Sequence, residues 1–162
     1  MEWSESGYLA LSALNVKDGY IDFKADVHYA NQELYDRWMS GNELYKGQVI
    51  FTTEAPMGNV AQIPDDGKYV LSQRTIAFNI DKDKITNDFL AVLLQSKNTH
   101  DDLKALASGG TAQGVSQSSL SKLTVRVPID ISEQQELGNL FKKINYQIAL
   151  HQRKPFGKDG GC

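Results

Sequence analysis

The sequence feature that most constrains the fold is an amphipathic segment near the C-terminus, residues 132–153. Its first four residues have the pattern of a capping box, with Ser132 as the N-cap and Gln135 at the third helical position. Behind this cap, apolar side chains follow the 4-3-4 spacing of a heptad seam, and they are Leu137, Phe141, Ile144 and Ile148. The segment therefore predicts a helix of about 30 Å, at about 1.5 Å per residue.

This seam has two interpretations that the pattern alone leaves open. The helix either pairs with a second helix, as in a coiled coil, or packs on its own domain as an ordinary amphipathic helix. The helix is predicted to span residues 131–154, because Pro155 and Gly157 follow it. The glycine-rich residues 155–162, which include Cys162, are expected to be disordered.

Composition limits the class of protein to which the chain belongs. With 162 residues, of which 41% are hydrophobic, it is long enough to bury one core. No apolar run is long enough to span a membrane, and the first residues lack the basic and apolar regions of a signal peptide. We therefore expect a cytoplasmic protein with no membrane contact.

The charge and the metal-binding residue types exclude further classes. A net charge of −3 argues against a protein that coats nucleic acid through bulk positive charge, but not against one that reads base edges. A single cysteine excludes an internal disulfide framework. The three histidines, His28, His100 and His151, show no metal-ligand spacing, so we expect no metal site.

Residues 7–81 are predicted to be mainly strand and turn. Asn31 is placed to cap a short helix that runs to Met39, and residues 49–52 form a β-rich run after Gly47. Residues 65–67, with the sequence Asp-Asp-Gly, are typical of a hairpin tip, and a long strand is predicted over residues 68–80.

The following residues favour short helices. One helix is predicted after Thr86 and a second after Thr99, the latter ending at Gly109-Gly110, and residues 123–127 predict a strand that Pro128 stops. The predicted fold class is α+β, a β-rich domain with short helices followed by a long C-terminal helix of the coiled-coil type.

Two segments carry part of a catalytic signature, and both favour a structural interpretation. Residues 109–114 have the glycine spacing of a phosphate-binding loop, but Val115 stands where the lysine is required. Residues 64–68 contain the Pro, Asp and Lys of a metal-dependent nuclease, yet Asp-Gly is also the preferred turn pair, which is the better interpretation. The sequence predicts a protein that is not an enzyme.

Six segments, taken in order, resemble the DNA specificity subunit of Type I restriction-modification systems. These segments are GQVIFTTEAPMGN (47–59), LSQR (71–74), GGTAQGV (109–115), LTVRVP (123–128), EQQ (133–135) and LHQRK (150–154). Each segment is weak alone, and their order makes the resemblance specific. It covers roughly residues 7–154.

The resemblance implies a target recognition domain over residues 1–130, followed by the spacer helix that joins two such domains in a full subunit. It also implies double-stranded DNA, a methyltransferase subunit and a restriction subunit as partners. No cofactor is expected on this chain, since S-adenosylmethionine and ATP belong to the partner subunits. One recognition domain without its opening strands, and one helix, would make the chain a half-subunit or a fragment.

A base-reading surface needs side chains with fixed donors and acceptors on rigidly held loops. The candidates for DNA contact are Thr52, Thr53, Glu54, Gln73, Arg74, Thr111 and Gln113. Glu54 can accept from a cytosine amino group, whereas Gln73 and Arg74 suit adenine and guanine. The alternatives are plain strand residues for the threonines, a local carboxylate partner for Arg74, and a simple connector for residues 109–114.

Two hypotheses about the function of the chain follow from the predicted helix and from the partners that the resemblance implies. A chain with one domain and one helix can rebuild a two-domain arrangement as a homodimer, with the residues Leu137, Phe141, Ile144 and Ile148 buried between antiparallel helices. Its target would then be two inverted half-sites with a gap. The alternative is a protein-interaction module, or decoy, that binds the methyltransferase subunit without reading DNA.

Overall fold

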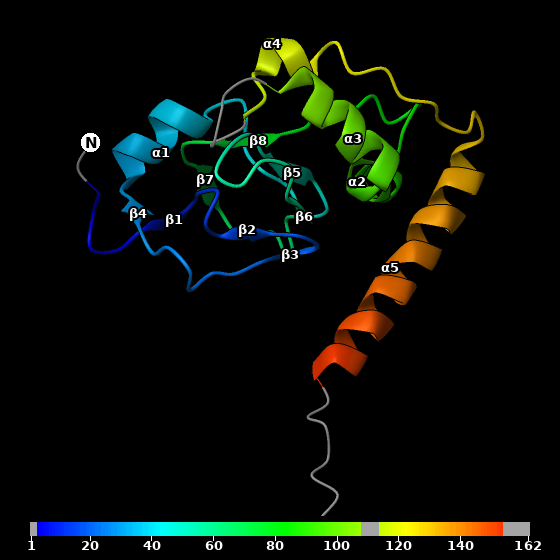
Figure 1. Cartoon of the computed structure of the whole chain (residues 1–162). Coiled ribbons are helices and arrows are strands. Elements are labelled where there is room, and N and C mark those ends of the chain that lie inside the picture. Colours follow the sequence, from blue (N-terminus) through cyan, green and yellow to red (C-terminus); the bar gives the residue numbers. More distant parts are fainter. Residues whose placement is uncertain (1–2, 108–113, 154–162) are drawn as a thin grey trace, which may run out of the picture.

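The computed structural model describes residues 3–107 and 114–153, with side chains up to Ile148, and has an α+β fold (Figure 1). The strands of these residues are β1 (Tyr8–Leu11), β2 (Val16–Lys17), β3 (Tyr20–Ile21), β4 (Tyr29–Ala30), β5 (Val49–Thr52), β6 (Val60–Gln62), β7 (Tyr69–Leu71) and β8 (Thr75–Ala77). The helices are α1 (Gln32–Met39), α2 (Asn87–Gln95), α3 (Lys97–Leu106), α4 (Gln117–Leu120) and α5 (Ile131–Arg153). The predicted α+β class is confirmed.

The strands form two small sheets and a hairpin. In the first sheet, β1 lies between β4, to which it is antiparallel, and β7, to which it is parallel. In the second, β5 lies between β6 and β8 and is antiparallel to both. The antiparallel β2–β3 pair turns at Asp18-Gly19, where Gly19 has a φ of 88°.

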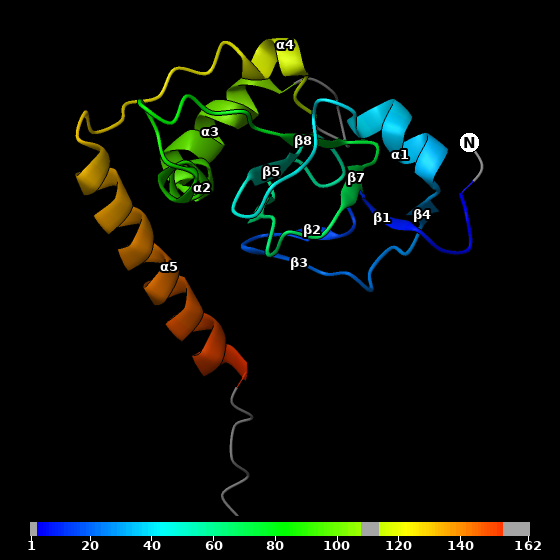
Figure 2. The same cartoon turned by 180° about the vertical axis from the view of Figure 1, so that it is seen from behind.

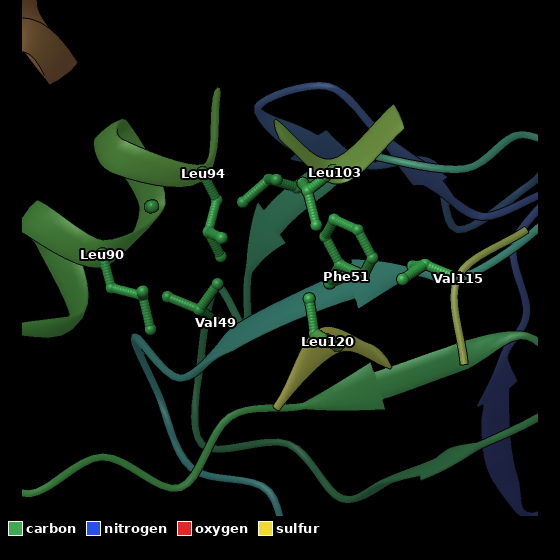
Figure 3. Close-up of a cluster of buried hydrophobic side chains, with 9 residues drawn as sticks. Val49, Phe51, Leu90, Leu94, Leu103, Val115 and Leu120 are labelled. Atoms are coloured by element: carbon green, nitrogen blue, oxygen red, sulfur yellow. The ribbon is translucent and has the colours of Figure 1, made fainter. Parts of the chain in front are cut away.

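The main hydrophobic cluster lies between the second sheet and the helices that cover it (Figure 3). Phe51 on β5 is fully buried, and Leu94 from α2 and Leu103 from α3 pack in the same cluster. All four residues of β5 are buried, because this strand is central in its sheet and covered on both faces. The predicted β run over residues 49–52 is confirmed.

The predicted cap at Asn31 is confirmed, and the helix predicted after Thr86 is present as α2. Asn31 caps α1, where its Oδ1 accepts from the Leu34 backbone N–H at 2.9 Å, and Thr86 caps α2. The second short helix begins earlier than predicted, at Lys97, because Ser96 provides its N-cap. It ends at Leu106, and the predicted C-cap at Gly109-Gly110 lies outside the described residues.

Three predictions about strands are wrong. Residues 65–67 do form a turn, but it connects β6 and β7, which belong to different sheets, so it is not a hairpin tip. The long strand over 68–80 is broken into β7 and β8 at Arg74, which adopts a positive φ. Residues 123–127 form no strand, because no neighbouring strand pairs with them among the described residues.

The C-terminal helix α5 projects along and beyond the body of the molecule in both views (Figures 1 and 2). It begins at Ile131, one residue earlier than the predicted cap at Ser132. That cap prediction is wrong because Asp130 takes the role: its Oδ1 accepts from the Ser132 backbone N–H at 2.7 Å. Within the described residues, we find no helix with the combined length and apolarity that a membrane crossing requires.

Candidate nucleic-acid interface

Three segments that are far apart in the sequence meet at the end of β5. The Thr53 backbone N–H donates to the Arg74 carbonyl at 2.9 Å, and the Val115 N–H donates to the Thr53 carbonyl at 2.9 Å. Glu54 and Gly114 form an antiparallel bridge beside them. These main-chain hydrogen bonds therefore fix two segments beside Thr53. One is the turn between β7 and β8, and the other is the segment after residue 113.

Two residues at this junction have a backbone conformation that is uncommon for side chains other than glycine. Arg74 has a φ of 66° and Ala55 a φ of 50°, and the peptide bond between Ala55 and Pro56 is cis. A positive φ in such residues persists only where the surroundings impose it, and such residues gather at binding sites. The turn at Arg74 is therefore held in a defined shape, and it presents two exposed polar side chains, Gln73 and Arg74.

Arg74 pairs with a carboxylate from the neighbouring segment. Its Nε lies 3.6 Å from Oε1 of Glu54, and the two side chains remain 52% and 43% exposed. A local carboxylate was the alternative interpretation of Arg74, and the ion pair is present. Because such an exposed pair stabilises the fold by at most about 1 kcal/mol, both groups remain accessible to a ligand.

Two hollows flank Arg74. One of about 510 Å³ is lined by Thr53, Glu54, Arg74, Thr75, Ile76 and residues 114–117. The other, of about 360 Å³, is lined by Gln73 and Arg74 together with side chains from the start of the chain: Trp3, Ser12, Asp26 and His28. The candidates Thr53, Glu54, Gln73 and Arg74 thus line two hollows that share Arg74, and we call the two hollows together the concave surface.

The second hollow contains residues that the sequence analysis did not select. The His28 Nε2 lies 3.0 Å from Asp26 Oδ1, and the other Asp26 oxygen accepts from the Ser12 hydroxyl at 2.6 Å. The His28 ring stacks on Trp3 with ring centroids 5.4 Å apart. No local motif marks these residues, since Trp3, Ser12 and the loop after β3 that carries Asp26 and His28 meet beside the β7–β8 turn only in the folded chain.

Not all of the predicted DNA contacts lie on this surface. The prediction for Thr52 is wrong, because its side chain is fully buried and its Oγ1 accepts from the Asn59 backbone N–H at 2.9 Å. Thr52 belongs to the central strand β5, where both faces are covered. Thr111 and Gln113 lie outside the described residues, although Gly114, which follows them, borders the first hollow.

The charges on the concave surface are mixed. Arg74 and Gln73 supply hydrogen-bond donors, whereas Glu54 and Asp26 supply carboxylate oxygens, which repel phosphate but accept from the amino group of cytosine. A surface for gripping the DNA backbone would carry an excess of lysine and arginine. The arrangement therefore suits direct contact with base edges better than contact with phosphates.

The cluster over residues 64–68 has the local contacts of a turn. The Asp65 carboxylate accepts from the Gly67 N–H and the Tyr69 hydroxyl, both at 2.8 Å. Burial, followed by the hydrogen bond to Asp65 and its charge, raises the pKa of Tyr69 to about 12. Within the described ranges, no group of three or more metal-ligating side chains is assembled, here or elsewhere.

Helix α5 has two distinct faces. One packs on α2 and includes Gln134 and Gly138, which are buried, and Lys142, which pairs with Asp88. The predicted seam lies about 100° further around the helix axis, at 3.6 residues per turn. Leu137 is half-buried there, but the exposed fractions are 42% for Phe141, 42% for Ile144 and 51% for Ile148, and Leu140 adds 52% beside them.

Comparison with known proteins gives the family. The family described as Type I restriction modification DNA specificity domain matches residues 21–156, most of the chain. The chain belongs to this family of specificity domains. The fold is also similar to the crystal structure of a Type-I restriction-modification system S subunit from M. genitalium, with a TM-score of 0.60 and 16% sequence identity. That similarity covers 92% of this chain and 35% of the other, so the chain spans about a third of the S subunit that it matches.

Proposed function

We propose that this chain is a sequence-specific DNA-binding specificity subunit, as a half-subunit or a fragment of one. It directs the methyltransferase and restriction subunits of a Type I complex to their target in the cytoplasm. Family membership supports this proposal. The share of the S subunit that the chain matches is in keeping with one recognition domain and one helix.

The observation that carries the proposal is the concave surface around Arg74. Glu54 comes from the segment after β5, whereas Gln73 and Arg74 come from the turn between β7 and β8, and a main-chain hydrogen bond fixes these two segments relative to one another. Rigid presentation of an amide, a guanidinium and a carboxylate is what discrimination between base edges requires. Residues 1–130 are the target recognition domain in this proposal, and residues 131–154 are its spacer helix.

The exposed seam of α5 supports pairing with a second helix. An apolar stripe turned away from the helix's own domain favours the coiled-coil interpretation over simple packing within the domain. In an antiparallel homodimer, Phe141 of one copy lies opposite Ile144 of the other, and Leu137 lies opposite Ile148. Two recognition domains joined in this way read two inverted half-sites separated by a gap.

The chain itself carries out no chemical step in this proposal. Methyl transfer with S-adenosylmethionine and ATP-driven restriction belong to the partner subunits, and the chain holds no cofactor. Its contribution is to place the catalytic subunits at one DNA sequence. Because the chain has a net charge of −3, the partner subunits supply much of the contact with the DNA backbone in this proposal.

The test is DNA modification in cells that carry this chain as their only specificity subunit. The proposal predicts methylation at one gapped, inverted motif, mapped by sequencing of modified bases. A chain that copurifies with the methyltransferase subunit and yet directs no methylation would instead be the decoy. Loss of the motif on substitution of Gln73 and Arg74 would tie the selection to the concave surface.

A further inference from the structure

Helix α5 is held to its domain by polar groups as well as by packing. Gln134 is fully buried, and its Nε2 donates to the carbonyls of Lys84 at 2.9 Å and Pro128 at 2.7 Å. Its Oε1 accepts from the Thr86 backbone N–H at 3.0 Å. Each of these partners is a main-chain group, and hydrogen bonds are directional, so the start of α5 is fixed in position and orientation.

A second polar contact involves Gln135, the next residue of the helix, and Lys142, about two turns further along. The carboxylate of Asp88, near the start of α2, accepts from Lys142 and Gln135 on α5 and from Gln62 on β6. The Asp88 side chain is only 21% exposed. One carboxylate therefore connects α5, α2 and the second sheet.

Between these contacts, α5 approaches α2 very closely at Gly138. A Cβ placed there would lie 2.8 Å from the Asp88 Cβ, 3.0 Å from the Asp88 carbonyl carbon and 3.1 Å from the Phe89 nitrogen. Two of these three atoms belong to the backbone, so they cannot move aside as a flexible side chain would. Only glycine allows this separation of the helices.

We infer that this anchor, formed by Gln134, Gln135, Gly138 and Lys142 on α5 with Asp88 on α2, sets the gap length of the DNA target. The inference rests on the proposed function and on pairing through the exposed seam. In a paired complex, the direction in which α5 leaves each domain determines how far apart the two Arg74 surfaces lie. The anchor residues are thus positioning residues that act on specificity without touching DNA.

The geometry gives the size of the effect. Replacing Gly138 with alanine requires α5 to move out by about 1 Å to reach ordinary van der Waals separation. With Gln134 as the pivot, about 6 Å away along the helix, this movement is a tilt of about 10°. At Ile148, about 21 Å from the pivot, the tilt displaces the helix of each copy sideways by about 3.5 Å, which is of the order of one base-pair step of B-DNA.

The experiment uses the complex of this chain with its methyltransferase subunit. The substrates are duplexes that carry the wild-type methylated motif, with its gap varied from two base pairs shorter to two longer. The variants are Gly138→Ala and Lys142→Met. The matched controls are Asn139→Ala and Lys143→Met, which change exposed neighbours on the same helix.

We expect wild type and both controls to methylate one gap length at least tenfold faster than its neighbours. Gly138→Ala should move the optimum by about one base pair, and Lys142→Met should lower the tenfold preference at least threefold. An unchanged optimum and preference in both variants, even with a lower overall rate, would overturn the inference. Lys142→Met removes only the ammonium group of a half-exposed side chain, so it remains informative if Gly138→Ala does not fold.

This outcome is distinguishable from failure of the proposed function. If the wild-type complex methylates no gapped, inverted target, the proposed function fails, and the inference fails with it. If the wild type selects one gap and the variants select it equally well, only the role of the anchor is refuted.

Discussion

Substitution of Ile144 with glutamate tests the pairing of α5 most directly. Ile144 lies on the seam, 42% exposed, and about 100° around the helix from the face that packs on α2. The change should therefore leave the folded domain intact. It places a charge at the centre of the apolar stripe, where the two copies of Ile144 lie close to the two-fold axis.

The magnitude follows from the exposed fractions. Full burial of such a side chain stabilises by about 1.5–3 kcal/mol, so the exposed parts of Phe141, Ile144 and Ile148 in two copies supply about 4–8 kcal/mol. Association itself costs about 4–15 kcal/mol, so the pair is marginal without partner subunits. Loss of Ile144 from both copies removes about 1–2.5 kcal/mol, and the buried charges raise the penalty to at least about 2 kcal/mol, a weakening of roughly thirtyfold.

The assay is sedimentation equilibrium of wild type and Ile144→Glu, with and without the methyltransferase subunit, alongside methylation of the gapped target. Tyr146→Glu is the matched control, because Tyr146 is 63% exposed on the side of α5 opposite the seam. Dimerisation and methylation should fall together in Ile144→Glu and persist in Tyr146→Glu. A wild type that stays monomeric even in the complex would refute the reasoning.

Three further predictions concern single side chains. Arg74→Ala should lose roughly 1–3 kcal/mol of discrimination at one base pair. The measurement compares binding to the cognate duplex with binding to singly substituted duplexes at fixed salt. An equal loss of affinity on every sequence would make Arg74 a phosphate contact instead. Asp66→Asn should leave DNA modification unchanged, because Asp66 is an exposed turn residue; loss of modification in a folded variant would point to a functional site there. Burial opposes ionisation of Asp88, but hydrogen bonds from Gln62, Lys142 and Gln135 and the charge of Lys142 outweigh it and lower the pKa. The stability that the Asp88 carboxylate contributes is present above about pH 4 and is lost as pH falls through the lowered pKa. The melting temperatures of wild type and Asp88→Asn should therefore differ at pH 7 and converge below the lowered pKa.

The elements that could be predicted from the sequence are those whose signals are local. Asn31 was identified as a cap because a cap bonds to a residue three positions away, and the helix after Thr86 was predicted from the local spacing of its apolar residues. The cap of α5 was predicted wrongly because Asp130 and Ser132 are both residue types that favour the N-cap position, and only the path of the preceding chain decides between them. Local patterns could not show that Arg74 breaks the strand over 68–80, because the contacts at that turn come from Thr53.

The candidate site was predictable only in part, for a related reason. The resemblance to a known family selected Glu54, Gln73 and Arg74, which lie together. It could not give the orientation of Thr52, because a strand buried on both faces shows no alternation of polar and apolar residues. Asp26 was missed because its place beside Arg74 depends on the long-range pairing of β1 with β7.

The hydrogen bonds of Gln134 have a consequence for how such a domain can change. Its three partners are backbone atoms of Lys84, Thr86 and Pro128, and those atoms are present whatever side chains occupy the three positions. The joint between domain and helix thus depends on the path of the main chain. Substitutions can change the concave surface that we propose to read DNA while the same helix, with its glutamine, still packs on the domain.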